Sequence, residues 1–110
     1  MQPHPSCVLL LRGSSQTLSK HEAACRAFAE EKGLDVLTVF REREVLPLQR
    51  RKVLRWLRAF CRNNSQAKFV VAYKERSISL NASELFLVGQ FLQKIGVTFL
   101  FVKETAHPDF

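Results

Sequence analysis

Four short apolar segments alternate along this chain with three segments of helical periodicity. The apolar segments have strand length and span residues 7–11, 35–40, 68–73 and 97–102. Helices are expected between them, over residues 19–33, 50–62 and 81–96. Strands that alternate with helices form parallel sheets through right-handed crossovers. The order therefore predicts one α/β domain with three layers, α/β/α, and a mostly parallel sheet of four to five strands.

Capping residues and apolar spacing define the expected helices. Ser19 with Glu22, and Asn81 with Glu84, have the spacing of a helix N-cap and its capping-box partner. Two apolar faces are expected, one in each of the first two helices: Ala23, Ala24, Ala27 and Phe28; Val53, Leu54, Leu57, Phe60 and Cys61. The third helix is apolar over more than one face. It is therefore either deeply buried or partly engaged in a subunit contact.

Composition narrows the class of protein. The net charge of +7 favours an anionic partner, of which nucleic acid is the commonest, although a basic soluble protein is the simpler alternative. The three cysteines are widely spaced and form no CxxC pair, so reduced buried thiols are expected and no metal or cofactor. No apolar run is long enough to cross a bilayer, and residues 1–6 do not resemble a signal peptide. A cytoplasmic protein with no membrane contact is predicted.

Polar loops follow the first three predicted strands. They span residues 12–17, 41–49 and 74–80, and each contains arginine. In open α/β sheets, ligands bind beyond the carboxyl ends of the strands. The sequence therefore concentrates its hydrogen-bond donors where such a sheet places its site.

Several of these segments resemble one family, the catalytic domain of serine site-specific recombinases of the resolvase/invertase type. Leu11-Arg12-Gly13-Ser14-Ser15 resembles the family's Arg-x-Ser motif after the first strand, and residues 22–33 resemble its first helix. Arg51, before Leu54 and Leu57, resembles the family's arginine ahead of a helix. Residues 69–76 resemble its strand ending in a Lys-x-Asp-Arg loop, and residues 96–102 its last strand.

The resemblance implies a chemistry and assigns roles. In this family a serine hydroxyl attacks a DNA phosphodiester without a metal, and arginines stabilise the charge that develops on phosphorus. Ser14 would then be the nucleophile. Three arginines would clamp the phosphate: Arg12, Arg51 and Arg76. Glu75 would replace the usual aspartate and orient an arginine or assist proton transfer.

This chain also departs from the family pattern. Leu10 replaces a tyrosine, His21 a glutamine and Ser79 a second arginine. The Ser-Gly element before the second helix is replaced by Val45-Leu46-Pro47. Family members continue into a long dimerisation helix and a DNA-binding domain. We therefore expect residues 1–110 to be a single resolvase-like catalytic-type domain with neither of these parts.

Simpler interpretations compete for the same residues. Ser14 is also typical of a loop serine that makes local hydrogen bonds. Arg12 and Arg76 are also explained by solvation or by a salt bridge to Glu75. His21, in the first turn of a helix, is expected at the surface, and Trp56 in the core or at an interface.

Arginines recur at helical spacing along the second helix. Arg51, Arg55, Arg58 and Arg62 are expected on one face, and no acidic residue interrupts residues 50–62. The predicted nucleic-acid-binding residues are Arg50, Arg55, Arg58 and Arg62. The competing interpretation is the solvated face of an amphipathic helix.

Two functions from different classes remain open. The favoured one is a divergent serine-recombinase-like domain associated with DNA recombination. It would bind nucleic acid or a partner, either a second copy or a recombinase, and its strand cleavage would be weakened or lost. The alternative is an active DNA strand-transfer enzyme that uses Ser14. A non-catalytic protein-interaction or regulatory α/β module, flavodoxin-like in the remotest case, is a further alternative.

Overall fold

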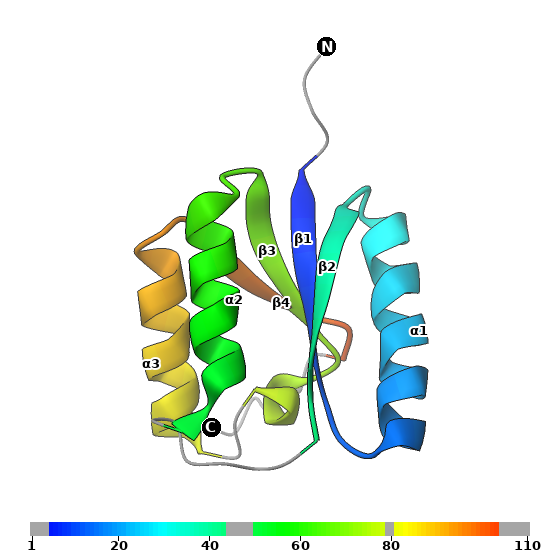
Figure 1. Ribbon diagram of the computed structural model, residues 1–110. Helices are drawn as coiled ribbons and strands as arrows, with labels where there is room; N and C mark the ends of the chain where they lie inside the picture. The colour runs from blue at the N-terminus through cyan, green and yellow to red at the C-terminus, as the bar shows by residue number, and fades with distance from the viewer. Residues whose placement is uncertain (1–4, 44–49, 79–80, 104–110) are drawn as a thin grey trace, which may run out of the picture.

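A computed structural model describes residues 5–43, 50–78 and 81–103. The elements are, in order, β1 (Ser6–Arg12), α1 (Ser15–Glu31), β2 (Asp35–Glu42), α2 (Lys52–Asn63), β3 (Ala67–Ala72), the 3-10 turn η2 (Glu75–Ser77), α3 (Ala82–Gln93) and β4 (Thr98–Phe101). The strands pair in the order β2-β1-β3-β4, and all pairings are parallel. Helix α1 covers one face of the sheet, while α2 and α3 cover the other (Figure 1). The predicted three-layer α/β/α fold is confirmed, with four strands in the described part of the chain.

Strand β1 is the centre of the structure. All seven of its residues are buried, because β2 and β3 flank it and helices cover both of its faces. Successive side chains of a strand point to opposite faces. Cys7, Leu9 and Leu11 accordingly join the core under α1, whereas Val8 and Leu10 join the core under α2 and α3. An uninterrupted apolar run is therefore what this central position requires.

Helix α1 begins at Ser15, so the predicted start at Ser19 is wrong. Its N-cap is Ser14, whose Oγ accepts a hydrogen bond from the backbone N–H of Thr17 at 3.3 Å. The predicted apolar face is confirmed only in part, because Phe28 packs against the core but Ala23 and Ala27 are exposed. The buried residues are Leu18, Cys25 and Ala29. Alanine has little apolar area, so the periodicity of alanines does not determine which face of a helix is buried.

Helix α2 starts two residues later than predicted. Arg51 is its N-cap residue and has a non-helical backbone, with φ −85° and ψ 89°. The predicted apolar face is confirmed. Leu54, Leu57 and Cys61 are buried, and the aromatic ring of Phe60 packs against them at the edge of the core.

Helix α3 has the predicted cap. Asn81 Oδ1 accepts hydrogen bonds from the backbone N–H groups of Ser83 at 2.8 Å and Glu84 at 3.2 Å. Val88 and Leu92 are buried, but Phe86 is 65% exposed and Leu87 is also exposed. The helix is thus buried on one side only, and apolar side chains remain on its outer side.

The three cysteines are buried and unpaired, as the sequence predicts. Burial raises the pKa of Cys7 to about 11 and that of Cys25 to about 12, which keeps both thiols protonated. Among the described helices, none is both long and apolar enough to span a bilayer. The predictions for Val45-Leu46-Pro47, for Ser79 and for residues 104–110 lie outside the described residues.

Candidate active site at the carboxyl edge of the sheet

The carboxyl ends of β1 and β2 bring Arg12 and Glu42 side by side. These two residues are partners in the parallel register of the two strands. Gly13 then donates its backbone N–H to the Glu42 carbonyl at 3.0 Å. Its φ of +140° is a conformation that side chains rarely adopt, and a Cβ at this position would lie 2.8 Å from Thr17 Cγ2. Glycine is therefore required between the end of β1 and the cap of α1.

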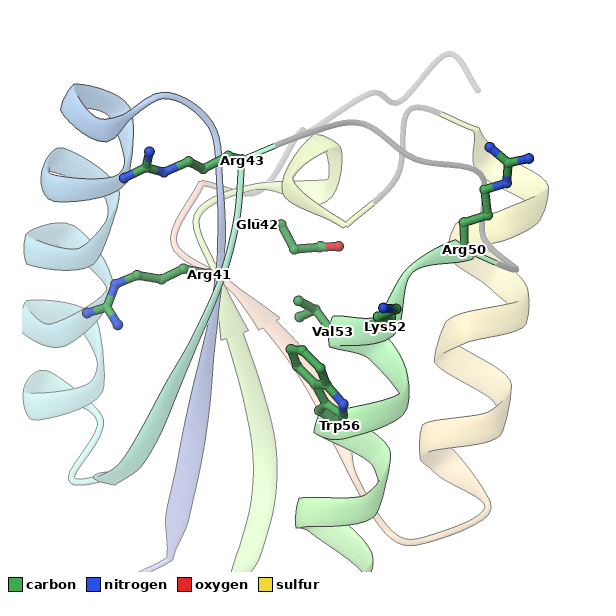
Figure 2. A pocket seen from close by; sticks show the side chains of 7 residues that line it. All are labelled: Arg41, Glu42, Arg43, Arg50, Lys52, Val53 and Trp56. Atoms are coloured by element: carbon green, nitrogen blue, oxygen red, sulfur yellow. The ribbon is translucent and has the colours of Figure 1, made fainter.

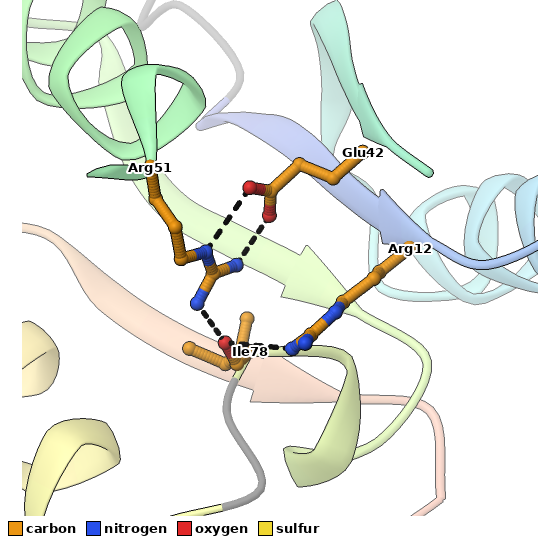
Figure 3. Close-up of polar contacts among 4 residues, drawn as sticks. All are labelled: Arg12, Glu42, Arg51 and Ile78. Atoms are coloured by element: carbon orange, nitrogen blue, oxygen red, sulfur yellow. Dashed lines mark hydrogen bonds and ion pairs between the residues drawn. The ribbon is translucent and has the colours of Figure 1, made fainter. Parts of the chain in front are cut away.

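Arg51 and Glu42 form a buried bidentate ion pair (Figure 3). Arg51 Nε donates to Glu42 Oε2 at 3.0 Å, and Arg51 Nη2 donates to Oε1. The side chains are 1% and 5% exposed, respectively. Arg51 Nη1 donates to the backbone carbonyl of Ile78. All three nitrogens of the Arg51 guanidinium thus donate to protein acceptors inside the molecule.

Arg12 approaches the same Ile78 carbonyl from β1. Its Nη1 donates to that oxygen over 3.5 Å, which is a long hydrogen bond, and the residue is 9% exposed (Figure 3). Burial and the nearby Arg51 charge both lower the pKa of Arg12. Two predicted phosphate-binding arginines therefore do come together. Both donate to the Ile78 carbonyl inside the molecule, and the carboxylate of Glu42 balances the charge of Arg51.

The side chain of the predicted nucleophile, Ser14, makes local hydrogen bonds to Thr17. Ser14 is exposed, and its hydroxyl donates to Thr17 Oγ1 at 3.0 Å while its Oγ caps α1. The local hydrogen bonding expected of a loop serine is therefore present. The structure places Ser14 two residues beyond Arg12, with its side chain open to solvent.

The other two predicted catalytic residues stand apart from this network. Glu75 is half-buried and Arg76 exposed, both in η2. Within the described ranges, neither joins the hydrogen bonds of Arg12 and Arg51, and no salt bridge links the two. The catalytic roles of Glu75 and Arg76 stay predictions.

Glu42 is the site residue that sequence reasoning missed. It belongs to the charged run Arg41-Glu42-Arg43, where nothing singles out the middle residue. The available signal was its position at the end of a strand predicted to be parallel, next to the strand that ends in Arg12. Carboxyl ends of neighbouring parallel strands meet at one edge of a sheet, and a buried guanidinium there needs a carboxylate.

His21 is not the surface histidine that the sequence predicts. Its ring stacks on Tyr73, with centroids 3.9 Å apart and planes at 14°. Its Nδ1 is buried and has no hydrogen-bond partner among the described residues. Burial, followed by the charge of Lys74, lowers its pKa. The imidazole thus joins α1 to the end of β3 as an uncharged ring.

A basic surface runs along α2. Arg55, Arg58 and Arg62 are exposed, and the Arg58 guanidinium carbon lies 5.6 Å from the centroid of the Phe91 ring on α3. The prediction that Arg51 shares this face is wrong, because Arg51 is the buried N-cap residue. Of the two positions expected for Trp56, the core is excluded because the residue is 58% exposed, and the interface stays a prediction.

The fold is a parallel sheet with helices on both faces, and the Arg-x-Ser turn follows its central strand. Residues 8–109 match the family described as "Resolvase, N terminal domain". The match covers nearly the whole chain, so the chain belongs to this family, which is consistent with DNA recombination. The resemblance noted from the sequence is confirmed.

Two solved structures are similar in fold. One is the C-terminal catalytic domain of ISC1926 TnpA, an IS607-like serine recombinase, with a TM-score of 0.76 and 18% identity over 91% of this chain and 71% of that one. The other is the C-terminal catalytic domain of IS1535 TnpA, also an IS607-like serine recombinase, with a TM-score of 0.66 and 21% identity over 92% and 73%. No curated protein matches the chain.

Proposed function

We propose that this chain is a DNA-binding member of the resolvase family in which strand cleavage is weakened or lost. The observation that carries the proposal is the buried network of Arg12, Arg51, Glu42 and the Ile78 carbonyl. A guanidinium that stabilises a phosphate must direct its donors toward the phosphate oxygens. Here the donors of Arg51 are directed toward Glu42 and Ile78.

The energetics favour retention of this network. Removing one partner of a buried ion pair leaves an uncompensated charge in the interior, at a cost of about 3–5 kcal/mol. A phosphate that recruited Arg51 would have to meet that cost while Glu42 repelled it. Arg12, which is nearly buried and turned toward the same carbonyl, offers the phosphate little compensation.

The α2 surface supports binding of DNA. Arg55, Arg58 and Arg62 project from one side of the helix over roughly 10 Å of its axis, and Arg50 adds an exposed charge before it. No acidic residue lies between Arg50 and Arg62 to neutralise them. Such a row of cations is suited to sequence-independent contact with a phosphate backbone.

The test of binding is its salt dependence. The protein is titrated onto a fluorescent duplex at several salt concentrations, and the triple variant Arg55→Gln, Arg58→Gln, Arg62→Gln is compared with it. Each phosphate contact contributes about 0.9 to the slope of log affinity against log salt. We expect the triple variant to lower that slope by roughly two to three. An unchanged slope would remove α2 from the interface, and absence of any DNA binding would overturn the proposal.

The exposed hydroxyl of Ser14 favours a second candidate, an active strand-transfer enzyme. In that reaction Ser14 Oγ loses its proton and bonds to phosphorus, the bond from phosphorus to the 3′ oxygen breaks, and the departing 3′ oxygen takes up a proton, so that no proton is gained or lost overall. The protein is incubated with supercoiled DNA, denatured, and assayed for a covalent adduct. We expect none. An adduct that Ser14→Asn abolishes would establish the second candidate, and this variant retains a good helix N-cap.

The predicted protein partner has its own support. Phe86 and Leu87 leave an apolar area on the outer side of α3, suited to a second copy or to another recombinase subunit. Sedimentation of the chain and of Phe86→Ser tests this contact, and a monomer at all concentrations would exclude the homodimer. The cytoplasmic location stays a prediction.

A further inference from the structure

A shallow hollow of about 440 Å³ lies between the end of β2 and the start of α2, outside the buried arginine cluster (Figure 2). One wall is apolar and comes from Val53 and Trp56 of α2. Figure 2 shows these two side chains on the side of the helix that faces the end of β2. The opposite wall contains Glu42, whose carboxylate is already bound by Arg51.

The remaining lining residues are cationic: Arg41, Arg43, Arg50 and Lys52. Arg41 Nη2 is paired with Glu22 of α1 at 2.6 Å, and Figure 2 shows the Arg41 and Arg43 side chains directed toward α1. Arg43, Arg50 and Lys52 are exposed and form no ion pair within residues 5–43, 50–78 and 81–103. The described lining therefore has an excess of positive charge, because its one carboxylate, Glu42, is neutralised by the buried Arg51.

The exposure of Trp56 is the unusual feature of this hollow. Tryptophan is the largest apolar side chain, yet 58% of this one is open to solvent. Lys52 precedes it by one helical turn, so the ammonium group and the indole ring share one side of α2. A flat aromatic surface beside cations is the arrangement with which proteins hold single-stranded nucleic acid.

We propose that this hollow binds an unpaired nucleotide of DNA, with its base stacked on Trp56 and its phosphate held by Lys52. The proposal rests on the proposed DNA-binding function and specifies the form of DNA that the domain prefers. The faces of paired bases are stacked inside a duplex and cannot reach the indole ring. The preference should therefore be for single strands or for distorted, partly opened duplex.

The charge of the described lining favours nucleic acid over a protein segment, because its one carboxylate, Glu42, is already paired with Arg51. An exposed tryptophan is also typical of protein interfaces, where hot spots pair it with apolar and mixed-charge surfaces. Among the described lining residues, the neighbours of Trp56 are one valine, four cationic side chains and Glu42, which Arg51 already binds. A phosphate next to an aromatic base satisfies both the charge and the aromatic surface.

Trp56 is the only tryptophan of the chain, so its fluorescence reports directly on the hollow. The protein is titrated with a single-stranded oligodeoxynucleotide, with the duplex of the same sequence, and with inorganic phosphate. We expect quenching of Trp56 by the single strand at concentrations where the duplex quenches little. Phosphate alone should leave the emission unchanged, because it has no base to stack.

Variants separate stacking from charge. Trp56→Ala should weaken binding of the single strand roughly 5- to 100-fold, the range expected for loss of one stacked base, and should leave duplex binding within about twofold. Trp56→Phe should retain part of the affinity. Lys20→Gln, which removes an exposed cation from α1 on the other face of the sheet, is the matched control for Lys52→Gln and should change neither. Lys52→Gln should weaken binding of the single strand but preserve quenching at saturation.

The outcomes distinguish this proposal from the one on which it rests. Suppose that both forms of DNA bind, that neither quenches Trp56 fluorescence, and that Trp56→Ala has the affinity of the parent for the single strand. The nucleotide site is then refuted, and the proposed DNA binding stands. Quenching by phosphate alone would also refute it. If neither form binds in low salt, both proposals fall. Far-UV circular dichroism of each variant confirms that the fold is retained.

Discussion

Arg51 and Arg55 are four residues apart in the sequence, and the structure treats them in opposite ways. Arg51 is 2% exposed and holds Glu42 and the Ile78 carbonyl, whereas Arg55 is exposed on the outer side of α2. The difference arises in the backbone. Arg51 precedes the helix with a non-helical ψ of 89°, so the helical spacing that relates Arg55, Arg58 and Arg62 does not extend to it.

The comparison separates two uses of arginine in one small domain. At the edge of the sheet, the guanidinium groups of Arg12 and Arg51 are buried. Their hydrogen bonds reach Glu42 of β2 and the backbone carbonyl of Ile78 after η2. On α2, the arginine side chains are exposed to solvent. A buried pair is sensitive to removal of one partner, whereas an exposed charge contributes little to folding. The following measurements test this division.

The largest effect should come from Glu42→Gln. It leaves the Arg51 guanidinium buried without a counter-charge, and we expect the free energy of unfolding in urea to fall by about 3 kcal/mol or more. Glu22→Gln is the matched control, because Glu22 pairs with Arg26 and Arg41 near the surface. Glu22→Gln should lower the free energy of unfolding by less than about 1 kcal/mol. Similar losses for the two variants would contradict the distinction between the two regions.

Ser14, at the rim of the buried cluster, should show an effect of intermediate size. Ser14→Ala removes the side-chain cap of α1 and should lower the free energy of unfolding by about 1 kcal/mol. Ser14→Asn should restore most of it, since asparagine is an equally good N-cap residue. Urea denaturation of both variants measures this. Equal destabilisation by alanine and asparagine would mean that Ser14 does not act through the cap.

The exposed arginines should affect stability least among the charged residues. Arg55→Gln and Arg62→Gln should each change the free energy of unfolding by no more than about 0.5 kcal/mol. Arg58→Gln should cost slightly more, up to roughly 1 kcal/mol, because its guanidinium lies over the Phe91 ring. A loss from Arg55→Gln as large as that from Glu42→Gln would show that α2 is not a solvated face.

A small pH effect is expected from His21, whose ring stacks on Tyr73. Burial lowers its pKa in the folded protein, so the unfolded chain binds more protons. The free energy of unfolding should therefore fall as the pH drops below about 6.5, and level off below the lowered pKa. Urea denaturation between pH 5 and 8 measures this free energy for the parent and for His21→Gln. Its slope against pH should be smaller in the variant. An unchanged slope would assign it to other groups.

Some site residues could be predicted from the sequence because their position depends on strand ends alone. Arg12 and Ser14 follow an apolar run that could only be a buried strand, and parallel topology then fixes the edge to which they belong. Glu42 also ends a strand, so its place at this edge could be inferred, but its contact with Arg51 and that of the Ile78 carbonyl could not. Their roles depend on where the segments before α2 and after η2 cross that edge, and no local pattern encodes such a crossing.

The sequence by itself determined the order of strands and helices, the three-layer fold and the family, because hydrophobic periodicity and motif order are local properties of the chain. Only the tertiary structure decided which arginines are buried, that Glu42 neutralises Arg51, and that Trp56 stands in solvent. The physical reason is that burial and charge pairing depend on contacts between segments distant in sequence. Arg51, with its non-helical backbone before α2, is buried, whereas Arg55, one helical turn later, is exposed.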